Sequence, residues 1–227
     1  MTGSTVADFY GRWAELYDRI ATLPGIARWR RAAAERTASP GDTVVDVGCG
    51  TGANLPFLRD RVGPTGRVVG VDITGPLLDR ARDRAADSPN VSVVRGDGAR
   101  LPIADADAVL GTFVCGLFAD PASVVDRWCD SVGAGGRVGL LDATASDDVR
   151  GRPLNPLFRA FVAAGSPTAD VGDTLRAPFG RSDAELSRRV AASRRALAGR
   201  TVDRSHETFA LGFVGLTSGT VETVPET

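Results

Sequence analysis

The length, composition and charge of the chain exclude several classes of function. Its 227 residues carry 27 basic side chains, all arginine, against 28 acidic ones, so the net charge is −1 and nucleic acid is not the expected partner. The absence of lysine excludes Schiff-base catalysis. One histidine, His206, and three scattered cysteines predict neither a Ser-His-Asp triad nor a metal site.

Hydrophobicity sets the expected location of the protein. Apolar residues make up 43% of the sequence, enough for one sizeable core. No apolar run approaches the roughly 20 residues of a membrane span, and the N-terminal region has no signal-peptide pattern. We expect a soluble, cytoplasmic protein without an integral membrane segment.

The N-terminal region, residues 1–40, is predicted to be a helical cap. Apolar residues recur at three- and four-residue steps from Asp8 to Arg36, and Leu23-Pro24-Gly25 divides this stretch into two helices. Ser39-Pro40-Gly41 ends the second helix, because proline cannot extend a helix and glycine turns freely.

Short β-branched runs then alternate with helical stretches over a predicted α/β core, residues 41–145. The first run, Thr43–Val47, is continuously apolar apart from one acid, which is typical of a strand buried on both faces. The alternation predicts right-handed crossovers and a parallel sheet. Further strands are expected at 67–71, 91–94, 108–111 and 137–141, and helices at 53–61, 76–87 and 121–132.

The pattern changes beyond Asp142. Residues 146–181 are predicted to form a lid or substrate insertion, because four prolines surround a single helical piece, Leu157–Ala164. The last part, residues 182–227, is expected to complete the core. It contains a predicted helix over Ser182–Ala198 and two strands, near 201–208 and 212–220, that pair antiparallel at the sheet edge.

The strongest local signal is Asp-Val-Gly-Cys-Gly-Thr-Gly, from Asp46 to Gly52, between the first strand and a helix. Alternate glycines let the backbone approach a ligand closely, and the helix N-terminus offers N–H groups, so a nucleotide-like ligand is predicted. The Gly48-x-Gly50-x-x-Ala53 spacing also fits a dinucleotide fingerprint. A nicotinamide-dependent oxidoreductase is therefore an open alternative.

Acidic residues at three predicted strand ends favour a different ligand. The carboxylate of Asp46 would repel a pyrophosphate but attract the sulfonium and ammonium of S-adenosylmethionine. Asp72 ends the second strand, where it can accept both hydroxyls of a ribose. Asp97 follows the third strand and can accept from an adenine amino group, or alternatively cap a turn.

Together with Gly96-Asp97-Gly98-Ala99, Leu101-Pro102 and Gly133–Val138, these segments resemble the ordered motifs of class I S-adenosylmethionine-dependent methyltransferases over residues 40–142. The resemblance implies a doubly wound, Rossmann-like α/β sheet of seven mostly parallel strands with an antiparallel last strand. It implies S-adenosylmethionine as the cofactor. The expected cofactor-binding residues are Asp46, Gly48, Cys49, Gly50, Gly52, Asp72, Ile73, Asp97, Gly98 and Thr112.

A narrower resemblance lies upstream. Leu16-Tyr17-Asp18, followed by Arg28-Trp29-Arg30-Arg31, resembles the start of the ubiquinone/menaquinone C-methyltransferase group. In that group the tyrosine helps to close over the cofactor, so the resemblance adds Tyr17 to the expected cofactor-binding residues. The arginines of this segment, and those from Arg188 to Arg195, are predicted to lie on solvated helix faces.

The predicted function is methyl transfer to a small, apolar or quinone-like acceptor held between the N-terminal helices and the apolar residues of the insertion. An N- or O-methyltransferase of a small amine or lipid, and a protein that binds S-adenosylmethionine without catalysis, are alternatives. Methyl transfer depends on alignment more than on acid or base power. No catalytic residue or oligomeric state is assigned, and His206, Asp142 and Tyr10 are only candidate bases.

Overall fold

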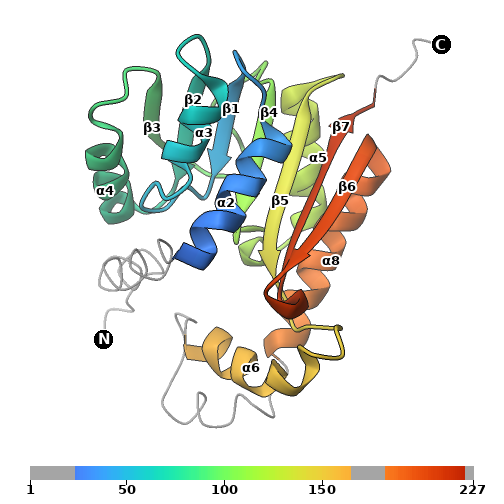
Figure 1. Cartoon of the computed structure of the whole chain (residues 1–227). Helices are drawn as coiled ribbons and strands as arrows, with labels where there is room; N and C mark the ends of the chain where they lie inside the picture. Colours follow the sequence, from blue (N-terminus) through green and yellow to red (C-terminus); the bar gives the residue numbers. More distant parts are fainter. Residues whose placement is uncertain (1–23, 165–181, 223–227) are drawn as a thin grey trace, which may run out of the picture.

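A seven-stranded sheet forms the centre of the molecule (Figure 1). The structure is a computed structural model that describes residues 24–164 and 182–222. The strand order is β3-β2-β1-β4-β5-β7-β6; β1 to β5 run parallel, and β7 is antiparallel to both of its neighbours. The strands are β1 Thr43–Val47, β2 Arg67–Asp72, β3 Val91–Arg95, β4 Ala108–Thr112, β5 Arg137–Ala143, β6 Thr201–Phe209 and β7 Val214–Val221.

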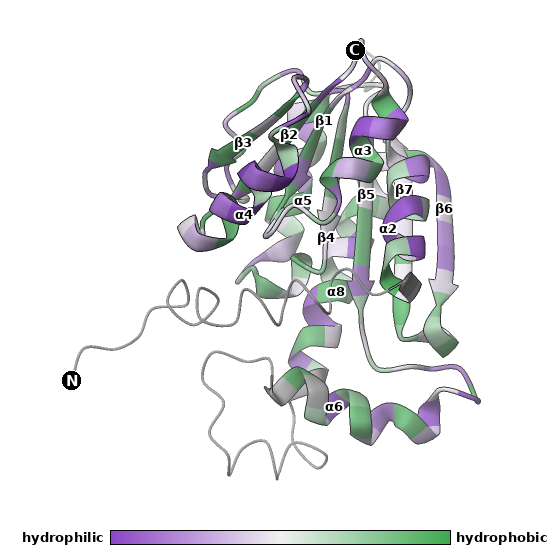
Figure 2. Ribbon diagram, turned by 60° about the vertical axis from the view of Figure 1, so that its left-hand side comes forward, coloured by the Kyte–Doolittle hydropathy of each residue, from purple (hydrophilic) through white to green (hydrophobic). Residues whose placement is uncertain are grey.

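Helices cover both faces of the sheet. The side chains of α2, α3 and α4 pack into one apolar cluster and those of α5 and α8 into another, on the opposite face. The hydropathy colours of Figure 2 show central strands that are mainly apolar and helices that alternate between apolar and polar. The helices are α2 Pro24–Thr37, α3 Leu55–Val62, α4 Gly75–Ala85, α5 Pro121–Val132, α6 Asn155–Ala164 and α8 Ser182–Arg200, with short 3₁₀ turns η1 Cys115–Leu117, η2 Arg152–Leu154 and η4 Ala210–Gly212.

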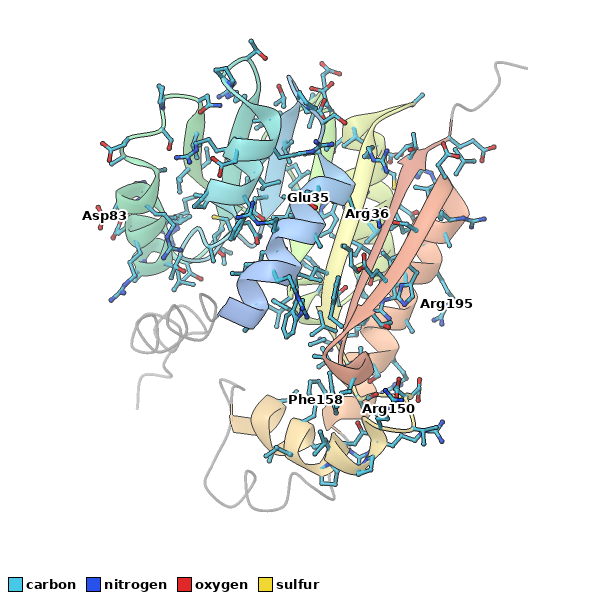
Figure 3. The ribbon with its side chains drawn as sticks, in the orientation of Figure 1. Glu35, Arg36, Asp83, Arg150, Phe158 and Arg195 are labelled. Carbon is cyan, nitrogen blue, oxygen red and sulfur yellow. The ribbon has the colours of Figure 1, made fainter. Side chains whose placement is uncertain are left out.

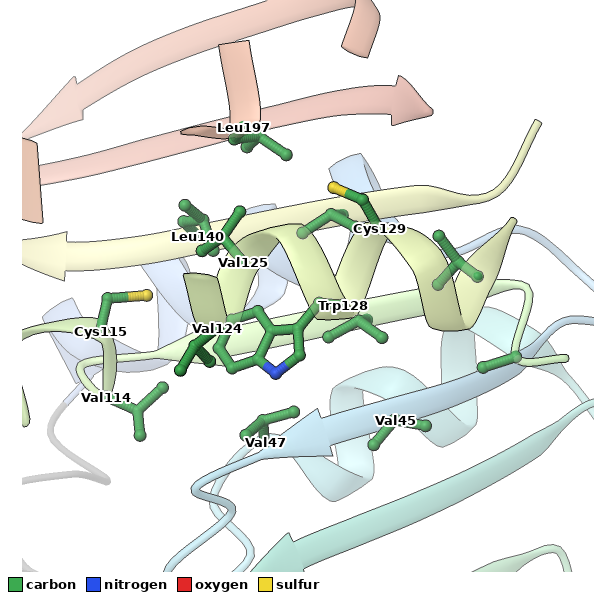
Figure 4. Close-up of a cluster of buried hydrophobic side chains, with 14 of the residues drawn as sticks. Val45, Val47, Val114, Cys115, Val124, Val125, Trp128, Cys129, Leu140 and Leu197 are labelled. Atoms are coloured by element: carbon green, nitrogen blue, oxygen red, sulfur yellow. The ribbon is translucent and has the colours of Figure 1, made fainter. Parts of the chain in front are cut away.

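Trp128 of α5 lies at the centre of the second cluster (Figure 4). Its side chain is fully buried, and its indole Nε1 donates to the carbonyl of Gly98 at 2.8 Å. The ring lies so close to β4 that a Cβ on Gly111 would stand 2.8 Å from it. Trp128 therefore joins α5, β4 and the loop after β3 in one rigid unit.

The predicted architecture is confirmed. The parallel strands, the antiparallel final pair and the seven-stranded sheet are all present. Helix α3 begins at Leu55, two residues later than expected, because residues Gly48 to Asn54 form the turn that follows β1. The first predicted helix and part of the insertion lie outside the described residues, so the division into cap, core, insertion and C-terminal part stays a prediction. Among the described helices, none is both long and apolar enough to cross a bilayer.

Candidate cofactor and acceptor site

The loop after β1 can be built only from glycine at the predicted positions. Gly48, Gly50 and Gly52 have φ angles of 65°, 54° and 80°, a region that L side chains rarely adopt. A Cβ on Gly48 would lie 2.7 Å from the side chain of Val114, and one on Gly52 would lie 2.8 Å from that of Leu55. Both the backbone conformation and, at Gly48 and Gly52, the close approach of a neighbouring side chain therefore require glycine in this loop.

Asp46 is fully buried at the end of β1. Its Oδ1 accepts a hydrogen bond from Asn54 Nδ2 at 2.7 Å, whereas Oδ2 has no hydrogen-bond partner among the described residues. Burial raises the pKa of Asp46 to about 7, although Asn54 and the charge of Arg30 act in the opposite direction. A buried carboxylate oxygen with no donor is costly, and a cationic ligand would offset that cost.

The partner of Asn54 on its other side is Arg30 of α2. Nη1 of Arg30 donates to Asn54 Oδ1 at 2.7 Å, and Asn54 Nδ2 also donates to Thr112 Oγ1 at 3.1 Å. Arg30 is only 6% exposed, so the prediction that it lies on a solvated helix face is wrong, although Arg28 and Arg31 are exposed as expected.

Sequence reasoning missed Arg30 and Asn54, yet a signal was present. Arg30 lies four residues after Ile26 and three and seven before Ala33 and Thr37, so it belongs to the buried stripe of α2. A charged residue on that stripe needs a partner inside the protein. Asn54 gives no comparable pattern, because its role depends on contacts from α2 and β4.

Asp72 is hydrogen-bonded to the glycine loop. Its Oδ2 accepts from the backbone N–H of Gly50 at 2.9 Å and its Oδ1 from that of Thr74 at 2.8 Å. The carboxylate is half-buried, so each oxygen has a further lone pair available to a ligand hydroxyl. The adjacent Ile73 is 61% exposed and presents an apolar side chain beside it.

Asp97 is exposed in the loop after β3. Its Oδ1 accepts from the backbone N–H of Ala99 at 2.9 Å, so the turn-capping role left open by the sequence is present. A Cβ on Gly98 would lie 2.6 Å from Val47, which places this loop against β1. Because β3, β2 and β1 are neighbours, Asp97, Asp72 and Asp46 follow or end three adjacent strands on one edge of the sheet.

The remaining sequence candidates either lie at this edge without a reactive side chain, lie elsewhere in the fold, or fall outside the described residues. Cys49 is buried, and burial holds the pKa of its thiol far above the ordinary value, so it contributes its backbone to the loop and no nucleophile.

His206 lies on edge strand β6, separated from β1 by β7, β5 and β4. Asp142 is buried on β5, beside Cys115 and Arg194. Tyr17 and Tyr10 lie outside the described residues.

Aromatic side chains gather below the strand ends. Trp29 of α2 stacks on Phe209 with ring centroids 6.3 Å apart. The ring centroid of Phe158 of α6, which Figure 3 labels, lies 5.3 Å from that of Phe213. Phe113, just after β4, has a φ of 56° and holds its ring under the Arg30 guanidinium at 5.6 Å.

Residues 44–136 match a family model described as a methyltransferase domain. A 2-phytyl-1,4-naphtoquinone methyltransferase of Synechococcus elongatus is 34% identical over 165 residues, which cover 69% of this chain and 68% of the relative. The chain belongs to the class I S-adenosylmethionine-dependent methyltransferases. This membership removes the nicotinamide-dependent oxidoreductase as an alternative.

Two further proteins that are named as methyltransferases are similar to this chain. The nocamycin O-methyltransferase of Saccharothrix syringae is 38% identical over 135 residues, 57% of this chain and 48% of that relative, so the chain spans about half of it. A SAM dependent methyltransferase from Aquifex aeolicus has a TM-score of 0.57 at 15% identity, over 92% of this chain and 98% of that one. The last comparison concerns the fold alone.

The residues present fit the cofactor of this family, S-adenosylmethionine. The glycine loop lacks side chains at Gly48, Gly50 and Gly52. Oδ2 of Asp46, which has no hydrogen-bond partner among the residues that the structure describes, offers a buried acceptor to a positive charge. A diphosphate would bring negative charge to the same place, which the Asp46 carboxylate disfavours.

Proposed function

We propose that this protein transfers the methyl group of S-adenosylmethionine to a small, apolar or quinone-like acceptor. The observation that carries the proposal is the buried carboxylate of Asp46 beside the glycine loop, because it suits a cationic nucleoside. In the described part of the chain, Oδ2 of this carboxylate has no hydrogen-bond partner. The near balance of 27 basic and 28 acidic residues favours a small molecule over a nucleic acid as the acceptor.

Two observations support a quinone-like acceptor. A relative of matching coverage is named as a methyltransferase of a naphthoquinone. The half-buried rings of Trp29, Phe113 and Phe209 also give the region below the strand ends an apolar, aromatic character that suits a planar ring. O-methylation is the second candidate, because the nocamycin relative is named as an O-methyltransferase.

Within this proposal six of the predicted residues have the following roles. Asp72 accepts from the ribose hydroxyls, Asp97 accepts from the adenine amino group, Gly98 and Ile73 border the base, and Tyr17 closes over the site. Thr112, which accepts from Asn54, holds the Asp46 side of the site in place. No catalytic base is assigned.

The bound cofactor supplies an activated methyl group on a sulfonium. The protein has to align the acceptor with that methyl group and exclude water, which supplies on the order of 7 to 11 kcal/mol in well-oriented reactions. This requirement is compatible with a site whose described residues are mainly backbone, carboxylates and aromatic rings.

The test is turnover of S-adenosylmethionine labelled in its methyl group with three acceptors: a short-chain naphthoquinol, a phenol and a primary alkylamine. We expect label in the naphthoquinol, at carbon. Label at an oxygen of the naphthoquinol or of the phenol would show O-methylation in place of C-methylation. Label in the amine alone would overturn the proposal of a quinone-like acceptor. Tight cofactor binding without turnover of any acceptor class, or of a metabolite extract, would favour a non-catalytic binding protein.

A further inference from the structure

Trp29 of α2 carries a buried N–H group that has no hydrogen-bond partner among the described residues. The other tryptophan that the structure describes, Trp128, donates from the same indole atom, Nε1, to the carbonyl of Gly98 at 2.8 Å. A buried donor without an acceptor is unfavourable, and most such groups in proteins are paired. A ligand that accepts a hydrogen bond from Trp29 would remove this cost.

The indole of Trp29 packs at the carboxyl end of β5. Ala143, the last residue of β5, pairs with Val214 of β7, and Val214 pairs with Phe209 of β6. These three residues form a row across the sheet, and Trp29 stacks on Phe209 with ring centroids 6.3 Å apart. Helix α2 lies against β4, β5 and β7 (Figure 1). The unpaired donor therefore belongs to the apolar region beside these strand ends.

The same turn of α2 also borders the cofactor side of the site. Arg30, the next residue, donates to Asn54 beside the glycine loop, and its guanidinium lies over Phe113 at 5.6 Å. Phe113 follows β4, which lies between β1 and β5, and it packs in the same apolar cluster as Trp29. Methyl transfer requires the acceptor atom to lie about 3 to 3.5 Å from the methyl carbon. An acceptor ring on this cluster would adjoin a cofactor held at the β1 loop.

We infer that the N–H of Trp29 donates to a ring oxygen of the acceptor and thereby directs methylation to the neighbouring carbon. This inference rests on the proposed function. A hydrogen bond to the oxygen occupies one of its lone pairs, so the oxygen becomes a weaker nucleophile and the adjacent ring carbon attacks instead. The carbon–sulfur bond breaks with its electron pair going to sulfur, the new carbon–carbon bond forms, and the proton of the attacked carbon passes to water. Trp29 is a positioning residue in this step.

The test compares the wild type with Trp29→Phe, which keeps an apolar ring and lacks the N–H. Turnover of labelled S-adenosylmethionine with a short-chain naphthoquinol gives the yields at carbon and at oxygen. Titration in the presence of S-adenosylhomocysteine gives the affinities for the naphthoquinol and for the matching naphthalene, which lacks both oxygens. In Trp29→Phe we expect the preference for the naphthoquinol over the naphthalene to fall about tenfold. The ratio of oxygen to carbon product should rise at least tenfold.

Phe209→Leu is the matched control, because it removes the ring that stacks on Trp29 but no hydrogen-bond donor. It should weaken both ligands alike and leave the product ratio as in the wild type. A Trp29→Phe variant that behaved in the same way would show that Trp29 only packs against the acceptor. That result would overturn the inference and leave the proposed function intact.

A measurement on the wild type alone provides a second test. With ¹⁵N-labelled protein, the indole N–H resonance of one of the three tryptophans should lie further downfield with the naphthoquinol bound than with the naphthalene bound. The same position with both ligands would overturn the inference without any variant. If the wild type methylated the naphthoquinol at neither carbon nor oxygen, the proposed acceptor would fail, and the inference with it.

Discussion

Ionisation of Asp46 couples cofactor binding to pH. Burial raises the pKa of this carboxyl to about 7 in the free protein, whereas a bound cation favours the ionised form. We therefore expect the affinity for S-adenosylhomocysteine to fall by up to tenfold for each pH unit below about 7. Calorimetry between pH 5.5 and 8 on the wild type and Asp46→Asn checks this. If the affinity of Asp46→Asn depended on pH as steeply as that of the wild type, another group would be responsible for the titration.

The same carboxyl should cost stability in the absence of ligand. Its folded pKa lies above the ordinary 3.8, so ionisation disfavours folding progressively as pH rises from about 4 to 7, by up to ~1.4 kcal/mol for each pH unit within that window. The melting temperature of Asp46→Asn, relative to wild type, should rise over this window and stay level above it. Asp142, which is also buried with a pKa of about 7, is present in both proteins and cancels.

Asp72 and Asp97 should differ in their importance. Asp72 is half-buried and bonds two backbone N–H groups of the site, whereas Asp97 is exposed and bonds one in its own turn. Asp72→Ala should weaken cofactor binding by at least tenfold, and Asp97→Ala by less. Unchanged affinity of Asp72→Ala, measured by calorimetric titration, would show that Asp72 does not bind the ribose.

At the scale of elements, the close contact between β4 and the Trp128 ring of α5 leaves no space for a side chain at Gly111. A Cβ on Gly111 would stand 2.8 Å from the Trp128 ring, so Gly111→Ala should lower the free energy of unfolding by roughly 1 to 3 kcal/mol. Gly199→Ala is the matched control, because nothing lies within 4 Å of its Cβ position in α8 and alanine favours helix. Urea denaturation should show opposite signs for the two, and equal losses would contradict the packing argument.

The elements that the sequence predicts well are those with one environment along their length. Thr43–Val47 forms β1 as predicted, because a β-branched run buried on both faces has no competing structure. Arg30 was misjudged for the opposite reason: three arginines within four residues look like a solvated surface, and only the packing of α2 on the sheet separates the buried one. The Asn54 bridge likewise joins residues far apart in sequence, which a linear pattern cannot reveal.

At the scale of the whole molecule, an interior strand and the edge strand beside it should differ in protection from hydrogen exchange. β7 is hydrogen-bonded to a strand on each side, whereas β6 is an edge strand with mostly exposed side chains. We expect the amides of β7 to exchange most slowly, because their exchange requires global unfolding. The outward-facing amides of β6 should exchange faster. Mass spectrometry of peptides from the two strands checks this; slower exchange in β6 would indicate that another surface covers the edge.

The insertion of β7 between β5 and β6 also has a consequence for synthesis on the ribosome. When β6 emerges, the strand that must lie beside it in the sheet has not yet been made, and the flank of β5 stays open. The short η4 turn lets β6 and β7 form a hairpin as soon as both exist, and that hairpin can then dock on β5 as a unit. Until that moment the nascent chain exposes the open edge of β5, the kind of edge to which other chains add.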